Sequence, residues 1–108
     1  MEYNGTEGSM ISRTEAQRLL TNYQNSPAFA ANNHTEGILF GRDHLLQILA
    51  QPGCKGMRIY FGKDGVLSTD PTTFVIVGTN AEGNDMTDLI LDIGYPCPTH
   101  CSSQSTKL

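Results

Sequence analysis

Three cysteines and one histidine are the residues of this chain whose types and spacing could do chemistry. Cys97 and Cys101 enclose a Pro-Thr-His segment, so His100 lies between two thiols, and Cys54 follows a Pro-Gly turn. Three thiolates and one imidazole, from His100, His34 or His44, can form a tetrahedral zinc site. Such sites normally draw their ligands from two closely spaced pairs, and Cys54 has no paired cysteine beside it. Zinc binding is therefore an alternative, and no metal or cofactor is predicted.

The C-terminal cysteine pair also fits a local disulfide. Pro96 and Pro98 restrict the backbone on either side of Cys97, which predicts a compact turn that holds Cys97 and Cys101. The two Cβ atoms could approach within bonding geometry in such a turn. Reduced thiols beside purely structural prolines are the third alternative, and the sequence leaves all three open.

No catalytic motif accompanies these residues. Redox chemistry of the thioredoxin kind needs a C-x-x-C spacing, and this chain has C-x₃-C. The G-x-S-x-G and H-E-x-x-H patterns are absent from the sequence. Asp88 and Asp92 would share the exposed face of a strand, where carboxylates ordinarily serve solubility rather than proton transfer. The sequence predicts no catalytic residues and no enzymatic activity.

Composition narrows the class of protein. The 108 residues suffice for one modest core. Seven scattered Lys and Arg against eleven Asp and Glu give a net charge of −4, which argues against nucleic-acid binding. No apolar run approaches the roughly 20 residues of a membrane span, and the polar, acidic N-terminus is unlike a signal peptide. We therefore expect no membrane span and a cytoplasmic location, with signal-independent export left open.

Two helices are predicted in the first half of the chain. The motif S-R-T-E at 12–15 is a capping box, and apolar residues at helical spacing follow it until Asn-Ser-Pro at 25–27 ends the pattern. A second helix is predicted over 42–51, with Gly41 as its N-cap and Pro-Gly at 52–53 as its end. The intervening residues are expected to form a loop.

Three strands are predicted in the second half, where the apolar period changes to two. They cover 57–61, 73–77 and 89–93, with turn residues between them. The order α-α-β-β-β with short links indicates an α+β fold, a two-layer sandwich of two helices on a three-stranded antiparallel meander. We expect one core that joins the two helices to the sheet. The helices contribute Leu19, Leu20, Tyr23, Leu45, Ile48 and Leu49, and the strands contribute Ile59, Phe61, Phe74 and Ile76 or their opposite-parity neighbours.

The predicted domain organisation is simple. Residues 1–10 form a flexible N-terminal arm, 11–101 a single α+β domain, and 102–108 a flexible C-terminal tail.

Several short segments carry a resemblance. They are 37–41 (GILFG), 49–62 (LAQPGCKGMRIYFG), 75–78 (VIVG) and 96–101 (PCPTHC). Together they resemble a group of small uncharacterised proteins of Bacteroidetes-type bacteria. The resemblance covers roughly residues 37–101 and implies a compact bacterial domain, without a mechanism or functional residues.

Strand parity predicts how the protein could associate. Val75 and Val77 face away from the predicted helices, and Tyr60 and Ile90 would extend this second apolar face on neighbouring strands. Short helices can cover only one face, so we expect a homo-oligomer, which extends into a filament if its contacts do not close. In the alternative, the chain's own loops cover the face within a monomer. The predicted function is a self-assembly or protein-interaction module, and the alternative is a small zinc-binding or thiol protein.

Overall fold

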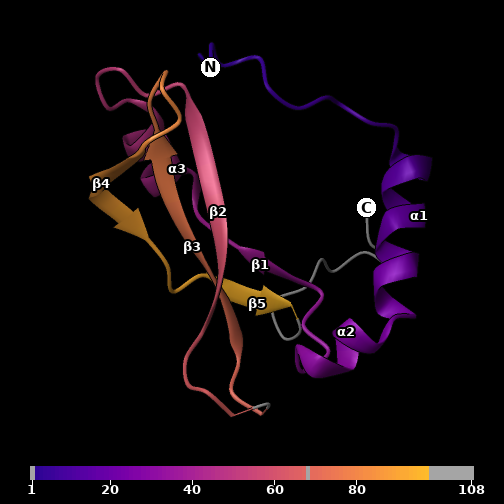
Figure 1. Ribbon diagram of the computed structural model, residues 1–108. Coiled ribbons are helices and arrows are strands. Elements are labelled where there is room, and N and C mark those ends of the chain that lie inside the picture. The colour runs from indigo at the N-terminus through magenta and orange to yellow at the C-terminus, as the bar shows by residue number, and fades with distance from the viewer. Residues whose placement is uncertain (1, 68, 98–108) are drawn as a thin grey trace. The chain divides into compact units, whose positions relative to one another are not determined.

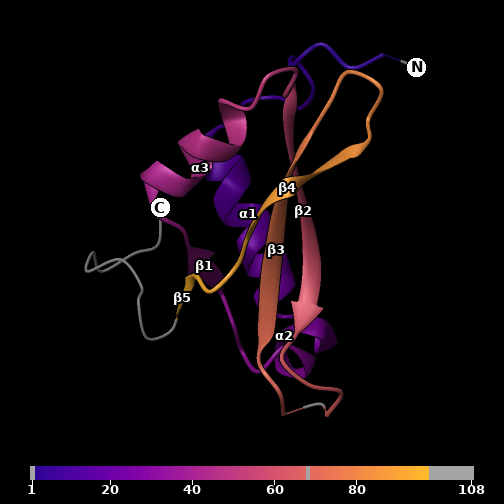
Figure 2. The same cartoon turned by 90° about the vertical axis from the view of Figure 1, so that its left-hand side faces the viewer.

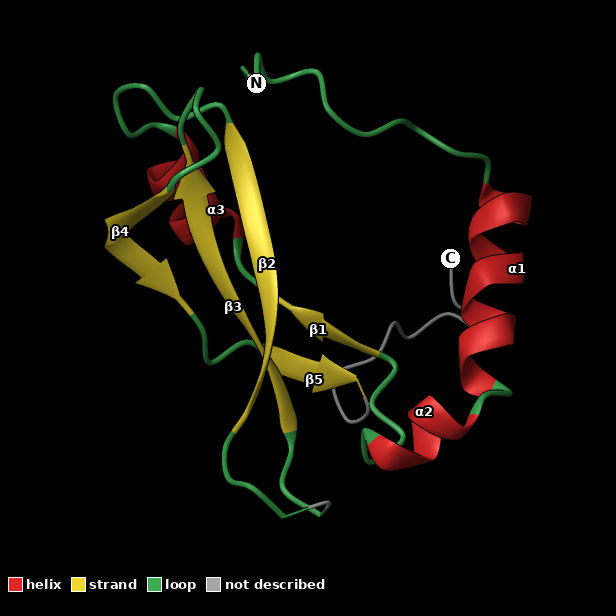
Figure 3. Ribbon diagram, viewed as in Figure 1, coloured by secondary structure: helices red, strands yellow, loops and turns green. Residues whose placement is uncertain are grey.

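The protein belongs to the α+β class. A computed structural model describes residues 2–67 and 69–97 (Figure 1). In chain order the elements are α1 (Arg13–Gln24), α2 (Pro27–Ala31), β1 (Gly37–Leu39), α3 (Arg42–Leu49), β2 (Gly56–Lys63), β3 (Thr72–Thr79), β4 (Asp85–Leu91) and β5 (Tyr95–Cys97). The α+β class and a three-stranded antiparallel sheet in the order β2-β3-β4 are confirmed. The element order departs from α-α-β-β-β, because α2, β1 and β5 are additional (Figure 3).

The chain divides into two compact units. The sheet unit, residues 2–8, 40–62 and 73–94, holds α3 and most of the three-stranded sheet. The helix unit, residues 9–39, 63–67, 69–72 and 95–97, holds α1, α2, β1 and β5. The predicted common core is wrong for α1, which has no buried residue, whereas Ile48 of α3 and Ile76 of β3 are buried as predicted. The two-layer packing of two helices on one sheet stays a prediction.

The core of the sheet unit is small. Ile48 on α3 is 2% exposed, and Ile76 and Val77 on β3 are 3% and 4% exposed. Gly41 caps α3 as predicted, and Asp43 in its first turn suits the positive end of the helix dipole. Leu49, placed in the core by periodicity, is instead 44% exposed. One helix of eight residues is only about 12 Å long and buries one narrow stripe.

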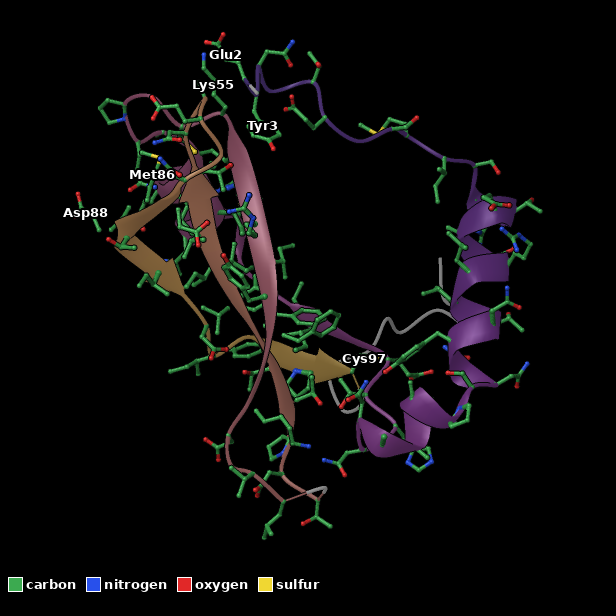
Figure 4. All side chains as sticks on the ribbon, in the orientation of Figure 1. Glu2, Tyr3, Lys55, Met86, Asp88 and Cys97 are labelled. Carbon is green, nitrogen blue, oxygen red and sulfur yellow. The ribbon has the colours of Figure 1, made fainter. Side chains whose placement is uncertain are left out.

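The pairing of β3 with β4 contains a register shift. Ile76 and Val77 pair with Leu91 and Ile90, but the next residue, Gly78, pairs with Met86. Residues 87–89 therefore lie outside the ladder, and Asp88 projects away from the sheet (Figure 4). The third strand begins earlier than predicted and ends at Leu91, before Ile93 with its left-handed φ of 60°. The alternation of apolar and polar residues over 89–93 could not reveal this shift, because unpaired residues in a strand change the face of the sheet to which the following side chains point.

The helix unit begins as the sequence indicated, with one difference. Ser12 Oγ accepts a hydrogen bond of 3.0 Å from the backbone N–H of Glu15. The Glu15 carboxylate accepts hydrogen bonds from Arg18. The predicted return bond from the Glu15 carboxylate to Ser12 is replaced by this ion pair, which lies one turn along the same helix.

Two further features order the helix unit. The rings of Tyr23 and Phe29 pack edge to face with centroids 5.6 Å apart, and α2 occupies part of the segment expected as a loop. The strand β1 pairs antiparallel with β5, with Gly37 opposite Cys97. Cys97 is thus the last residue of β5, and the compact turn predicted to hold Cys97 and Cys101 runs into residues outside the described ones and stays a prediction.

Candidate functional site

The β2 edge of the three-stranded sheet carries consecutive exposed apolar side chains. Ile59 is 53% exposed, Tyr60 44% and Phe61 80%. We call these three residues the edge triplet. β2 stands first in the strand order, so within the described sheet only its β3 side is paired (Figure 2). An exposed apolar edge strand is a template on which another strand can pair.

Ile59 and Phe61 were predicted to belong to the core, and this prediction is wrong. Their side chains share a face with Phe74, because the Phe61 and Phe74 rings pack edge to face at 5.4 Å. The helix α3 contacts β4, at the opposite edge of the sheet. It is too short to cover β2 as well, so the two side chains are exposed.

The backbone of β2 presents a defined set of groups to the open edge. Phe61 lies opposite Phe74, and a Cβ built on Gly62 would lie 2.9 Å from Thr73 Oγ1. The same register places Asp64 opposite Pro71, where the Asp64 N–H donates to the Pro71 carbonyl at 3.2 Å. Along an antiparallel ladder, opposite residues alternate between pairs that exchange backbone hydrogen bonds and pairs that do not. Tyr60 and Gly62 thus direct their N–H and C=O groups to β3, whereas Ile59 and Phe61 direct theirs outward.

A charged cluster reaches across the other face of the sheet. The Tyr60 hydroxyl donates to Asp85 Oδ2 at 2.5 Å, and Arg58 Nη1 donates to Asp85 Oδ1 at 2.5 Å and to the Gly83 carbonyl at 3.0 Å. These hydrogen bonds, the one from Tyr60 foremost, hold the pKa of Asp85 below its ordinary value. These hydrogen bonds hold the Tyr60 ring in place on the edge strand. Because Arg58 is bound to Asp85, its charge does not protect the open edge of β2 from another strand.

The replacement Tyr60→Phe is expected to raise the pKa of Asp85 toward the ordinary 3.8, because it removes the principal hydrogen bond to the carboxylate. The folded-state pKa of Asp85 is depressed, so its contribution to stability is present above the unfolded pKa and is lost as the pH falls through the folded pKa. Carboxyl ¹³C NMR titration measures the shift. Tyr23→Phe, in the helix unit, should leave the midpoint of Asp85 unchanged. An unchanged midpoint in Tyr60→Phe would show that Arg58 alone sets this pKa.

The N-terminal arm lies at the start of β2. The Tyr3 N–H donates to the Ala81 carbonyl at 2.6 Å, and the Tyr3 ring occupies the space that a side chain at position 83 would need (Figure 4). Gly83 has a φ of 84° and lacks a Cβ, which allows both the turn and this close contact.

A cleft of about 450 Å³ separates the arm from the first half of β2. Glu7, Lys55, Met57 and Ile59 are among its lining residues. The Glu7 carboxylate accepts hydrogen bonds from the N–H groups of Asn4 at 3.1 Å and Gly5 at 3.0 Å. These bonds, that of Asn4 first, lower the pKa of Glu7. The cleft beside the open edge is thus lined by one acidic residue, Glu7, and two basic residues, Lys55 and Arg58.

The predicted zinc ligands are only partly described. Cys54 is a half-buried free thiol whose Sγ donates to the Gly56 carbonyl at 3.2 Å. Cys97 lies in the helix unit, with its Sγ 3.5 Å from Glu36 Oε2. His100 and Cys101 lie outside the described residues. Residues 2–67 and 69–97 contain no cluster of three potential ligands among His, Cys, Asp and Glu. Zinc binding and the Cys97–Cys101 disulfide stay predictions.

The predicted assembly face is divided by the structure. Tyr60 and Ile90 are exposed, Ile90 by 60%, and Val75 is half-buried. Val77 is buried and pairs with Ile90, so it belongs to the core rather than to an accessible surface. Tyr60 alone among the four predicted residues belongs to the edge triplet. Whether a side chain is exposed at a sheet edge depends on the order of the strands. The alternation of residues within one strand does not predict that order.

Comparison of the chain with protein-family models, curated proteins and solved structures finds no match. Among the described residues, no helix has the length and apolar character needed to cross a bilayer.

Proposed function

We propose that the protein is a non-enzymatic interaction module that associates with copies of itself through the edge of β2. The observation that supports this function is the edge triplet, in which Ile59, Tyr60 and Phe61 are all exposed on a strand with one unpaired side in the described sheet. Association would cover these side chains and satisfy the outward backbone groups of the same strand.

The two edges of the sheet differ in how they are protected. β4 is interrupted by the register shift after Val77 and carries Asp85 and Asp88. A broken ladder and acidic side chains oppose the addition of another strand. β2 has eight residues and contains no proline, and its central charge, Arg58, is turned to Asp85. The β2 edge is therefore the favoured site of association.

The replacement Phe61→Lys is expected to abolish self-association, because it puts a solvated charge at the most exposed position of the edge triplet. Light scattering over a concentration series measures the average molar mass of the protein particles in solution. The wild-type mass should rise with concentration, whereas the variant should stay monomeric with an unchanged far-UV circular dichroism spectrum.

Val66→Lys is the matched control, since Val66 is 100% exposed in the loop after β2 and lies outside the edge triplet. Its mass should follow that of the wild type. A wild-type protein that stays monomeric at every concentration, or a Phe61→Lys variant that associates normally, would contradict the proposal.

A further inference from the structure

We propose that Asn4 is a site of self-modification, at which the N-terminal arm converts its own asparagine to aspartate and isoaspartate with loss of ammonia. The arm, residues 2–8 of the sheet unit, carries Asn4 directly before Gly5, the only Asn-Gly pair in the sequence. In this reaction the backbone nitrogen after an asparagine attacks the carbonyl carbon of the asparagine side chain. Glycine permits the approach because it has no Cβ.

The proton on the attacking nitrogen already has an acceptor in the arm. The Gly5 N–H donates to Glu7 Oε1 at 3.0 Å, and the Asn4 N–H donates to Glu7 Oε2 at 3.1 Å. A general base acts over about 2.6–3.2 Å, so Glu7 Oε1 is within reach of this proton. The hydrogen bonds, that of Asn4 first, lower the pKa of Glu7, so its side chain is ionised at neutral pH and is able to accept.

The carbonyl group under attack is polarised by two donors. Asn4 Oδ1 accepts a hydrogen bond from the Thr6 N–H at 3.0 Å and another from the Thr6 hydroxyl at 2.6 Å. Attack on Cγ moves negative charge onto this oxygen, and donors that are already directed at it stabilise the charge without rearranging. The arm thus supplies a base for the nucleophile and an oxyanion site for the same Asn-Gly pair.

The reaction consumes only water. The bond between Gly5 nitrogen and Asn4 Cγ forms as the proton on that nitrogen passes to Glu7. The bond between Asn4 Cγ and Nδ2 then breaks, and Nδ2 takes the proton back from Glu7 and leaves as ammonia. A succinimide ring remains. Water opens the ring at Cγ to give aspartate, or at the backbone carbonyl carbon to give isoaspartate.

The position of Asn4 gives the modification a consequence for the cleft beside β2. The neighbours of Asn4, Tyr3 and Gly5, both line this cleft, together with the basic residues Lys55 and Arg58. Either product adds a carboxylate at this point of the arm, and isoaspartate also lengthens the backbone by one carbon. Because the Tyr3 N–H is bonded to the Ala81 carbonyl, the change falls beside an attachment of the arm to the sheet unit.

Incubation of the purified full-length protein at neutral pH tests the proposal. Peptide mass spectrometry follows the conversion at Asn4, and electron-transfer fragmentation distinguishes isoaspartate from aspartate. The folded protein should react faster than the same chain unfolded in guanidinium chloride, because unfolding removes the contacts of Glu7 and Thr6. Asn80 is the internal control. Its Oδ1 also accepts two N–H donors, from Glu82 and Asn84 at 3.0 Å, but alanine follows it, so it should stay intact.

Two variants separate the base from the oxyanion site. In the folded protein Glu7→Gln should slow the reaction at Asn4 by about tenfold or more, since it removes the base. Thr6→Val removes only the hydroxyl donor and should slow it by about tenfold. Both variants should react at the wild-type rate when unfolded, where these hydrogen bonds are lost.

Three results would overturn the proposal. A folded wild type that reacts no faster than the unfolded chain would mean that the hydrogen bonds protect Asn4. A folded Glu7→Gln variant that reacts at the wild-type rate would remove Glu7 as the base. Equal slowing of this variant in the folded and unfolded states would assign the effect to the local sequence rather than to the folded arm.

Discussion

Replacing Ile48 by alanine is expected to lower the free energy of unfolding by about 2–5 kcal/mol. Ile48 is the most buried large side chain among the described residues, with 2% exposure, and it is the one residue through which α3 enters the core. Its Cγ2 lies 3.3 Å from the point where a Cβ on Gly78 would stand, so the side chain packs directly on β3. Truncation would leave a cavity at the centre of a small core, which has few other contacts to compensate.

The adjacent residue provides the control. Leu49 has the same number of carbon atoms but is 44% exposed, so Leu49→Ala should lower the free energy of unfolding by no more than about 1 kcal/mol. Urea denaturation followed by circular dichroism gives both values. Equal losses in the two variants would mean that α3 does not pack through Ile48.

The second large effect is expected at Gly78, where alanine should lower the free energy of unfolding by about 1–3 kcal/mol. An added Cβ would stand 2.9 Å from Gln51 Nε2 and 3.1 Å from Cys54 Sγ, besides Ile48. Gly78 is buried, and it follows the register shift of β3 directly. The methyl group would force α3 and the turn after it away from the sheet.

Gly56→Ala is the matched control in the same sheet. A Cβ at Gly56 would meet Thr79 Oγ1 at 3.6 Å, an ordinary contact, so this change should be neutral or slightly stabilising. The same urea titration compares the two variants. If Gly78→Ala were as stable as the wild type, the close approach of α3 to β3 would be absent in solution.

Local signals in the sequence predicted the parts of the fold that depend on near neighbours. Ser12 marked the start of α1, and Gly41 marked the start of α3. The change to period two at Met57 located β2, and the apolar run from Thr73 located β3. A helix cap or a strand pleat involves residues within a few positions of one another, so the sequence contains the whole interaction.

Pairings between distant segments were not predictable in this way. β1 and β5 have three residues each, and Ile38 opposite Pro96 has no local signature. Neither the register shift between Val77 and Gly78 nor the burial of Val77, at 4% exposure, has a signature in the residues near it in sequence. Helical periodicity likewise placed Leu49 in the core. The eight-residue helix α3 buries only Ile48 among the described residues, and Leu49 is exposed.

The sequence by itself determined where α1, α3, β2 and β3 lie, because capping, turn chemistry and periodicity act over a few residues. The tertiary structure alone decided that Ile59 and Phe61, apolar residues of a regular strand, are exposed. Their exposure follows from the strand order, which puts β2 at an edge, and from the position of α3 over β4. Strand order arises from contacts between residues far apart in the chain, and no pattern within a single strand encodes it.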